Sequence, residues 1–336
     1  MKKLICFLFI VLLSKTSFSQ LKPSYDQYIL NNYLLNPAVT GIENYTDVKS
    51  SFRNQWVGIQ GAPVTYSFSI HTPIGKADTR ITPTSFHLVG YDPINDYNVE
   101  NNTIIEPYHG VGLSFINDKA GYINRWTLSA SYAYHTPITS NTILSGGINL
   151  GLSRIDLDRG KINLGDPNQY DPSIGYNFDE LTKFKFESGV GLWLHNTKYY
   201  IGLSALNIVL GANKFTNFNS YGNPFTPNFF FTTGYRHYFK NDLSITPSLM
   251  FQYQKDGLTD THLSCKLQYL DKIWIGGSYK ISNLINAYSG LVGLNISKAF
   301  QISYSYEIAA ESRLSSYTNN THEILLGFIL GNYSKY

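Results

Sequence analysis

The chain has 336 residues, of which 43% are hydrophobic, 15% aromatic and 15% charged, and its mean hydropathy is −0.17. It is too aromatic and too weakly charged for a disordered protein, and two cysteines exclude a disulfide-rich scaffold. The net charge of +3 gives no reason to expect nucleic acid or another polyanion as a partner.

The amino terminus predicts export. Residues 1–19 have the pattern of a cleaved signal peptide, because two lysines precede the apolar run Leu4–Leu13 and Ser17-Phe18-Ser19 is a small-x-small cleavage site. Their removal takes away three lysines and no acid, which leaves 23 basic (26 − 3) and 23 acidic residues. The mature protein is therefore expected to be neutral. It keeps a single cysteine, Cys265, and can form no internal disulfide.

The body of the chain alternates between apolar and polar residues. In residues 64–71 every second residue is apolar, and the residues between them are Thr, Ser, Ser and His. A period of two places successive side chains on opposite faces of a β-strand, and helical spacing fits none of these stretches. The same pattern recurs in residues 128–135, 144–153, 262–269 and 300–308. The sequence therefore predicts an all-β protein.

About fourteen such stretches can be counted, most of them about nine to thirteen residues long. That is long for soluble strands, which average about five or six residues, but close to the 9–11 residues of a strand that crosses a bilayer. One face is aliphatic and aromatic, and the other is rich in Ser, Gly, Thr, Asn and Gln but scarcely charged. The predicted strands are 46–57, 63–72, 109–117, 124–135, 142–154, 184–195, 198–206, 227–239, 243–253, 259–269, 272–281, 289–297, 299–308 and 321–331.

These strands predict a transmembrane antiparallel β-barrel of the outer-membrane type, with lipid against the apolar face and a polar lumen. A soluble sandwich would carry more charge on its outer face. The length and polarity of the strands thus place residues 46–336 in a barrel in the cell outer membrane.

The connections between the strands alternate in length, as outer-membrane barrels require when both termini lie in the periplasm. The expected periplasmic turns are short, and most of the others are long. The Pro- and Asn-rich residues 73–108 break this rule, because they stand where a tight turn belongs. Either they form an insertion, which we prefer, or the strand register is shifted by one hairpin there.

Short motifs then give a resemblance. The sequence contains NPAxxG at 36–41, RxQWxGIxGAP at 53–63, NDxxG at 117–121 and HEI at 322–324. In this order they closely resemble the PorP/SprF family of the type IX secretion system of Bacteroidota, from about residue 20 to the carboxyl end. The motif residues of interest are Asn36, Pro37, Gly41, Arg53, Gln55, Trp56, Gly61, Pro63, Asp118, Gly121, Glu307, His322 and Glu323.

Two departures from the family pattern stand out. Family members pass from the His-Thr-Pro word to the NDxxG strand by a short link, whereas residues 73–108 intervene here. The usual YSYD reads Tyr-Ser-Tyr-Glu at 304–307, a mild change. The insertion leaves the resemblance intact but allows for a paralogue with its own cargo or partner.

The resemblance implies an outer-membrane barrel accessory to type IX secretion. Such proteins assist the export or surface retention of cargo, often a large adhesin used in gliding motility, and contact periplasmic secretion components. The implied partners are the outer-membrane bilayer, type IX secretion components and a secreted cargo protein, with no nucleic acid. No cofactor is expected. The main alternative is a passive outer-membrane channel or hydrophobic-solute transporter.

Histidines together with acids are candidates for a site of hydrolysis or metal binding. Neighbours in a strand point to opposite faces, so His322 and Glu323 cannot both address one site. The sequence contains no metal-ligand spacing of the HxxxH or CxxC kind. We therefore predict no enzyme, and expect His135, His195, His262 and His322 to make hydrogen bonds in the lumen.

Further expectations concern the lumen and the membrane surface. Arg53 and Gln55 should face the lumen, where a buried arginine needs an acidic partner such as Glu307 or Glu323. Tryptophans near strand ends fit the aromatic girdles at the membrane interfaces. These tryptophans are Trp56, Trp126, Trp193 and Trp274.

Residues 20–45 carry many apolar side chains ahead of the first strand, among them Tyr28, Ile29 and Leu35. Exposing them to water would be costly. We expect this segment to fold into the lumen or onto the periplasmic mouth as a plug. At the other end of the barrel, the loops 155–183, 207–226 and 309–320 carry aromatic residues that favour contacts with another protein.

Overall fold

The structure is a computed structural model. It describes residues 27–77, 80–85, 106–157, 183–209, 227–240, 243–254, 257–270, 272–283, 285–297, 299–310 and 317–331. The expected signal peptide lies outside these residues, as do most of the three aromatic loops. Where the chain is described, none of its helices is long and apolar enough to cross a membrane.

In the described part of the chain, three short 3-10 helices precede the strands: η1 (Tyr28–Leu30), η2 (Asn32–Leu34) and η3 (Pro37–Val39). The strands are β1 (Thr46–Asn54), β2 (Val64–Ile74), β3 (Tyr108–Ala120), β4 (Ile123–Thr139), β5 (Thr142–Leu157), β6 (Lys183–His195), β7 (Tyr199–Val209), β8 (Asn228–Tyr235), β9 (His237–Lys240), β10 (Leu243–Gln254), β11 (Thr259–Tyr269), β12 (Ile273–Ser282), β13 (Ala287–Asn295), β14 (Phe300–Ala309) and β15 (Thr321–Leu330).

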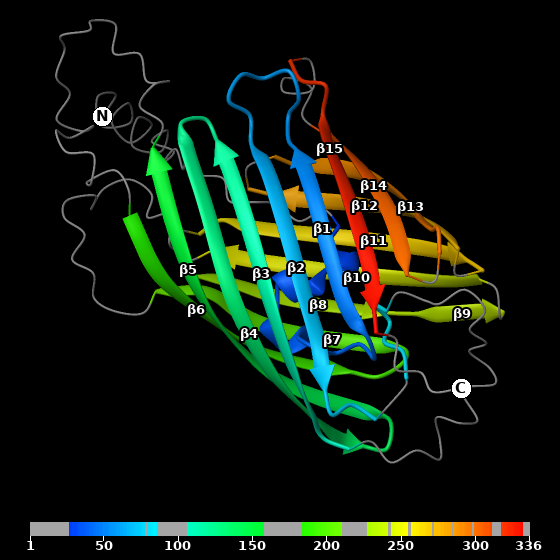
Figure 1. Ribbon diagram of the computed structural model, residues 1–336. Coiled ribbons are helices and arrows are strands. Elements are labelled where there is room, and N and C mark those ends of the chain that lie inside the picture. The colour runs from blue at the N-terminus through cyan, green and yellow to red at the C-terminus, as the bar shows by residue number, and fades with distance from the viewer. Residues whose placement is uncertain are drawn as a thin grey trace, which may run out of the picture.

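The strands form one closed antiparallel barrel (Figure 1). Apart from β8 and β9, each strand pairs with its neighbours in sequence, and β1 pairs with β15, which closes the sheet. Strands β8 and β9 continue one another on either side of Arg236 and both pair with β10, so they act as one strand of the barrel. The prediction of a fourteen-stranded outer-membrane type barrel is confirmed.

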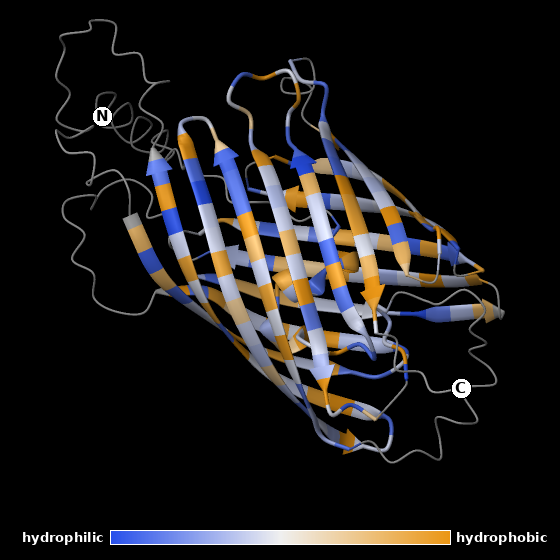
Figure 2. Ribbon diagram, in the orientation of Figure 1, coloured by the Kyte–Doolittle hydropathy of each residue, from blue (hydrophilic) through white to orange (hydrophobic). Residues whose placement is uncertain are grey.

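The two faces of the wall differ in polarity, as the alternation predicted. On β2, Tyr66 and Phe68 point outward and are 51% and 42% exposed, whereas Ser67 and Ser69 point inward and are buried. Alternating orange and blue bands follow the strands in Figure 2. Because water would be an unfavourable solvent for so many large apolar side chains, the outer face is suited to lipid.

The two ends of the barrel differ in their connections. At one end, which we call the short-turn end, the strands are joined by 140–141, 196–198, 241–242, 270–272 and 296–299. The opposite long-loop end carries 158–182, 210–227 and 310–320, together with the short links 121–122, 255–258 and 283–286 and the link 55–63. In outer-membrane barrels the short turns face the periplasm.

The residues between β2 and β3 lie at the short-turn end. Strands β2 and β3 pair directly from Val64 with Lys119 to Ile74 with His109. Residues 75–107 therefore connect two neighbouring strands, and β2 extends into the Pro-rich stretch as far as Ile74. Residues 86–105 are outside the described part of the chain.

Candidate functional site: the filled lumen

A segment of the chain runs through the inside of the barrel. Residues 27–45, which we call the lumenal segment, include the three short helices seen in dark blue within the barrel in Figure 1. Nearly all of these residues are buried. The first part of the expected 20–45 segment is not among the described residues.

Apolar side chains hold the lumenal segment against the wall. Its residues join three buried clusters with inward-facing apolar residues of the strands. Tyr33, Ala38, Val39 and Ile42 pack with Trp193 and Tyr200. Ile29 and Leu30 pack with Trp274, Leu291 and Leu325. Tyr28 and Leu35 pack with Phe230 and Met250. The apolar residues of the segment are thus removed from water.

Hydrogen bonds fix the segment on several strands at once. The Asn31 side chain donates to the Ser69 hydroxyl over 3.1 Å, and the Ser204 hydroxyl donates to the Leu35 carbonyl over 2.5 Å. Tyr33 and Ser131 share a hydrogen bond of 2.7 Å, and burial raises the pKa of Tyr33 to about 12. The contacts reach β2, β4 and β7, so the segment is tied to separate parts of the wall.

Three of the four fixed positions of the NPAxxG motif have a structural reason. Asn36 caps η3 by accepting from the Ala38 amide over 2.9 Å, and its amide group donates to the Leu192 and Leu203 carbonyls. Pro37 occupies the first turn of η3, where no amide donor is needed. Gly41 has φ of +71° and lies against backbone atoms of Gly110 and Thr72, so a side chain would be strained and crowded.

Residues after β2 close over the segment from the short-turn end. Lys76 donates to the Ile42 carbonyl over 2.5 Å. Residues 80–85, which we call the cap, are tied to Glu43, because the Thr82 hydroxyl donates to Glu43 Oε1 over 2.9 Å and Ser85 donates to Oε2. Glu43, Thr82 and Ser85 are all buried. Burial raises the pKa of the Glu43 carboxyl above its ordinary value.

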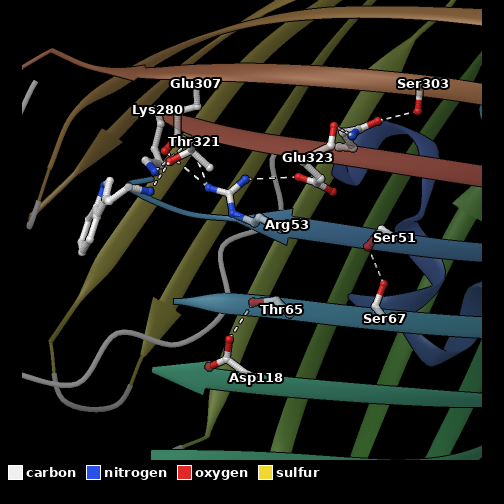
Figure 3. A network of polar contacts seen from close by, with 12 residues as sticks. Ser51, Arg53, Thr65, Ser67, Asp118, Lys280, Ser303, Glu307, Thr321 and Glu323 are labelled. Atoms are coloured by element: carbon white, nitrogen blue, oxygen red, sulfur yellow. Dashed lines mark hydrogen bonds and ion pairs between the residues drawn. The ribbon is translucent and has the colours of Figure 1, made fainter. Parts of the chain in front are cut away.

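A buried ionic network lies near the long-loop end. Arg53 on β1 donates to Glu323 on β15 over 3.1 Å and to Glu307 on β14 over 3.4 Å (Figure 3). Lys280 on β12 donates to Glu307 over 3.1 Å. All four side chains are less than 10% exposed. Both acids predicted as partners of Arg53 are therefore present, and two cations face two carboxylates.

Other motif residues shape the same end of the barrel. Gln55 is buried just after β1, and its backbone N–H donates to the Pro63 carbonyl over 2.9 Å. Trp56 has φ of +52°, and its amide donates to the Thr321 hydroxyl over 3.3 Å. On β3, Asp118 accepts from Thr65 over 2.6 Å. The Gly121 amide donates to the carbonyl of Gly61, and both glycines have positive φ. The motif residues of β1–β3 thus shape the wall and the link 55–63 at the long-loop end.

The histidines separate between the two faces. His135, His195 and His262 are buried on the lumenal side, and His135 Nε2 donates to the Thr40 carbonyl over 2.8 Å. His322 differs from the prediction, because it lies on the outer face and pairs with the Tyr304 hydroxyl over 2.6 Å. Its neighbour Glu323 is lumenal. The expected separation of these two neighbours is confirmed.

The girdle prediction is wrong for two tryptophans. Trp193 and Trp274 are 1% and 3% exposed and point into the lumen, where they pack on the lumenal segment. Their rings fill the space over Gly202 and Gly293 on neighbouring strands. A position near the end of a strand does not determine whether the side chain points toward lipid or into the lumen. Trp126 lies on the outer side and meets Phe184, and Trp56 lies in the β1–β2 link, where it is partly exposed.

A polar cavity of about 90 Å³, which we call the vestibule, lies between the lumenal segment and the wall near the long-loop end. Tyr33, Leu34 and Pro37 line it from the segment side. Hydroxyl and amide side chains make up most of the wall: Ser114, Thr127, Ser129, Ser131, Asn149, Ser188, Asn207, Asn228 and Gln252.

Of the three charged residues that line the vestibule, Asp118 belongs to the NDxxG motif, whereas Arg125 and Glu187 were not predicted from the sequence. Arg125 on β4 donates to Glu187 on β6 over 2.9 Å, and Asp118 also lines the cavity. The two-residue alternation along β6 places the side chain of Glu187 on the same, lumenal face as that of His195. Its partner could not be read from spacing, because two strands that are far apart in sequence bring the pair together.

The described residues contain no group of three or more His, Cys, Asp or Glu side chains that could hold a metal ion. The polar groups of the lumen mainly pair with one another or with the lumenal segment. What the arrangement offers is a shaped polar surface near the long-loop end and a packed interior beneath it.

Solved structures with a low sequence identity to this chain include an outer-membrane protein, a transporter and a porin. Omp33 of Acinetobacter baumannii has 9% identity and a TM-score of 0.47, and the match covers 87% of this chain and all of that one. The toluene transporter TbuX of Ralstonia pickettii has 10% identity and a TM-score of 0.44, with 90% and 93% covered. A mutant of the Rh. blastica porin has 10% identity and a TM-score of 0.34, with 85% and 99% covered. No curated protein matches the chain.

The family comparison covers nearly the whole chain. The sequence model described as type IX secretion system membrane protein PorP/SprF matches residues 17–328. These residues include the lumenal segment, the cap and every strand except the last two residues of β15. The chain therefore belongs to the PorP/SprF family, and it is an outer-membrane β-barrel associated with type IX secretion.

Proposed function

We propose that this protein docks or escorts cargo of the type IX secretion system at the cell surface, for example a gliding adhesin, and that residues 20–45 plug the barrel. The observation that carries the proposal is the packed lumen. Three apolar clusters and hydrogen bonds to several strands hold the lumenal segment inside the barrel. We therefore assign the function to a surface that binds protein and not to a pathway through the lumen.

The proposal assigns export to a signal peptide cleaved before Gln20. The short-turn end would then face the periplasm and the secretion components, and the long-loop end would face outward toward cargo. The loops at the outer end carry the aromatic residues expected to contact protein. Of these, Tyr317 is among the described residues and is 80% exposed. Docking energy would come from such an interface and needs no cofactor.

The alternative is a passive channel or hydrophobic-solute transporter. Electrical recordings on purified protein in planar bilayers separate the two functions. We expect no steady conductance from the intact protein, because the lumenal segment fills the lumen. A steady open-pore current at modest voltage would support the channel and contradict the plug.

Docking itself is tested in intact cells. Covalent cross-linking in the membrane, followed by purification of the barrel and mass spectrometry, should recover type IX secretion components or a large surface protein. A variant lacking residues 311–316 of the last outer loop serves as a comparison, since it leaves the strands intact. Repeated recovery of the barrel alone would contradict docking.

A further inference from the structure

We propose that the vestibule is a receptor site for one basic side chain, lysine or arginine, on an exposed segment of the secreted cargo. This inference rests on the proposed docking function and adds the chemistry of the contact. It is drawn from the position, charge and lining of the cavity.

The vestibule lies where a ligand from outside would arrive. Asp118 is close to the end of β3, Arg125 is close to the start of β4 and Glu187 is close to the start of β6, all toward the long-loop end. The lumenal segment lines the cavity through Tyr33, Leu34 and Pro37. A group that enters from the long-loop end therefore meets a floor and not a passage.

The charge of the lining favours a cation. Among the residues that line the vestibule, Asp118 and Glu187 are acidic and Arg125 is basic, so the formal net charge is −1. Arg125 is already bonded to Glu187 over 2.9 Å and also interacts electrostatically with Asp118. Asp118 also accepts from Thr65 over 2.6 Å and interacts electrostatically with Arg53, which does not line the cavity. A carboxylate has about four acceptor sites, so the two carboxylates keep acceptor capacity for a second cation in the cavity.

The size and lining favour a side chain of a protein. The cavity of about 90 Å³ exceeds the roughly 10–15 Å³ that one water needs, but it is too small for a folded domain. Serine, asparagine and glutamine side chains in the wall can bond to the peptide groups beside a basic residue. A sugar would be favoured by an open aromatic face, but the aromatic lining residues Tyr33 and Phe230 are only 6% and 4% exposed.

The charge preference can be measured without knowing the cargo. A Ser129→Cys variant, in a Cys265→Ser background, places one thiol in the vestibule. We expect a trimethylammonium thiosulfonate reagent to label it about tenfold faster than the matching sulfonate reagent, relative to their rates on free cysteine, because one nearby net charge acts in a partly shielded site. Asp118→Asn should bring this ratio close to one.

The matched control is Asp156→Asn, which removes an acid near the same end of the barrel but on the outer face, where Asp156 pairs with Arg154 over 2.8 Å. It should leave the ratio unchanged. Heat-modifiable migration in gels verifies that each variant is folded. Equal labelling by the two reagents, faster anionic labelling, or no labelling by either would overturn the cation site.

The source of the cation is tested in secreting cells. A photo-reactive group attached to the Ser129→Cys thiol should cross-link to a secreted protein, next to a lysine or arginine in its sequence. Cross-linking to polysaccharide, or to protein segments without basic residues, would overturn the proposal. If the loops cross-link cargo but the vestibule does not, the vestibule inference fails while docking stands; if neither does, docking itself fails.

Discussion

At the scale of single residues, the buried ionic network offers the sharpest test of the lumen. Arg53→Ala would remove the guanidinium that Glu323 and Glu307 share, while Lys280 would still contact Glu307. Breaking a buried ion pair typically costs about 3–5 kcal/mol, because an uncompensated charge remains. We expect a loss of that size in the free energy of unfolding, measured by urea titration in lipid vesicles.

The matched change is Arg154→Ala, which breaks a pair on the outer face. The side chains of Arg154 and Asp156 are 37% and 29% exposed, and an exposed pair contributes about 0–1 kcal/mol. The two arginines lie toward the same end of the barrel. Equal losses for the two variants would mean that the network contributes no more than a surface pair.

A second residue-scale prediction concerns glycine in the wall. A side chain on Gly147 would collide with the backbone of Pro37 and Ala38, whereas its neighbour Gly146 points outward and would meet only Leu192 at 4.0 Å. Gly147→Ala should therefore displace the lumenal segment and make it sensitive to protease added to proteoliposomes. Gly146→Ala should not, and equal protection of the segment in the two variants would contradict its seating on Gly147.

At the scale of elements, the strands could be predicted because alternation directly encodes two unlike surroundings. The attachment of the cap and the lumenal position of Trp193 were harder to predict. The first depends on contacts with Glu43, which lies far from the cap in the sequence and is not indicated by the residues of the cap themselves. The second follows from the two-residue alternation, since Trp193 shares its face with Glu187 and His195, whereas its position near the strand end, on which the girdle rule rests, does not determine the face. The Arg53 partners were predictable because barrel closure pairs β1 with β15.

The cap is an element whose attachment should depend on pH. Burial raises the pKa of Glu43 above its ordinary value of 4.5, so the neutral carboxyl is favoured when the cap is closed. The resulting stabilisation is complete below the unfolded pKa and is lost as the pH rises through the raised, folded pKa. Hydrogen-exchange protection of the Thr82 and Ser85 amides should fall with rising pH, by at most about tenfold per pH unit.

Glu43→Gln provides the control, because the amide stays neutral at every pH and its oxygen can still accept from Thr82. The variant should lose the pH dependence of protection. Protection that increases with pH in the natural protein, or an identical pH profile in the variant, would show that Glu43 does not control the cap.

At the scale of the whole molecule, the barrel and its lumenal segment form a single packed body. Apolar clusters connect the segment to β6, β7, β8, β10, β12, β13 and β15. Lys76 and the cap cover it from the short-turn end, and the vestibule lies on its other side. A protein built in this way presents two different faces to the two sides of the membrane. This asymmetry suits a dock that is approached by secretion components from one side and by cargo from the other.

Whether the segment must leave the lumen during secretion can be decided by locking it in place. The Thr40 and Ser131 hydroxyl oxygens are 3.0 Å apart, so Thr40→Cys with Ser131→Cys in a Cys265→Ser background places two thiols within reach of a disulfide. A dock works with its lumen filled, and we therefore expect the oxidised variant to display cargo at the cell surface as well as each single-cysteine variant does. A block in display that is reversed by a reductant would instead require movement of the plug, and would favour a channel whose opening carries the function.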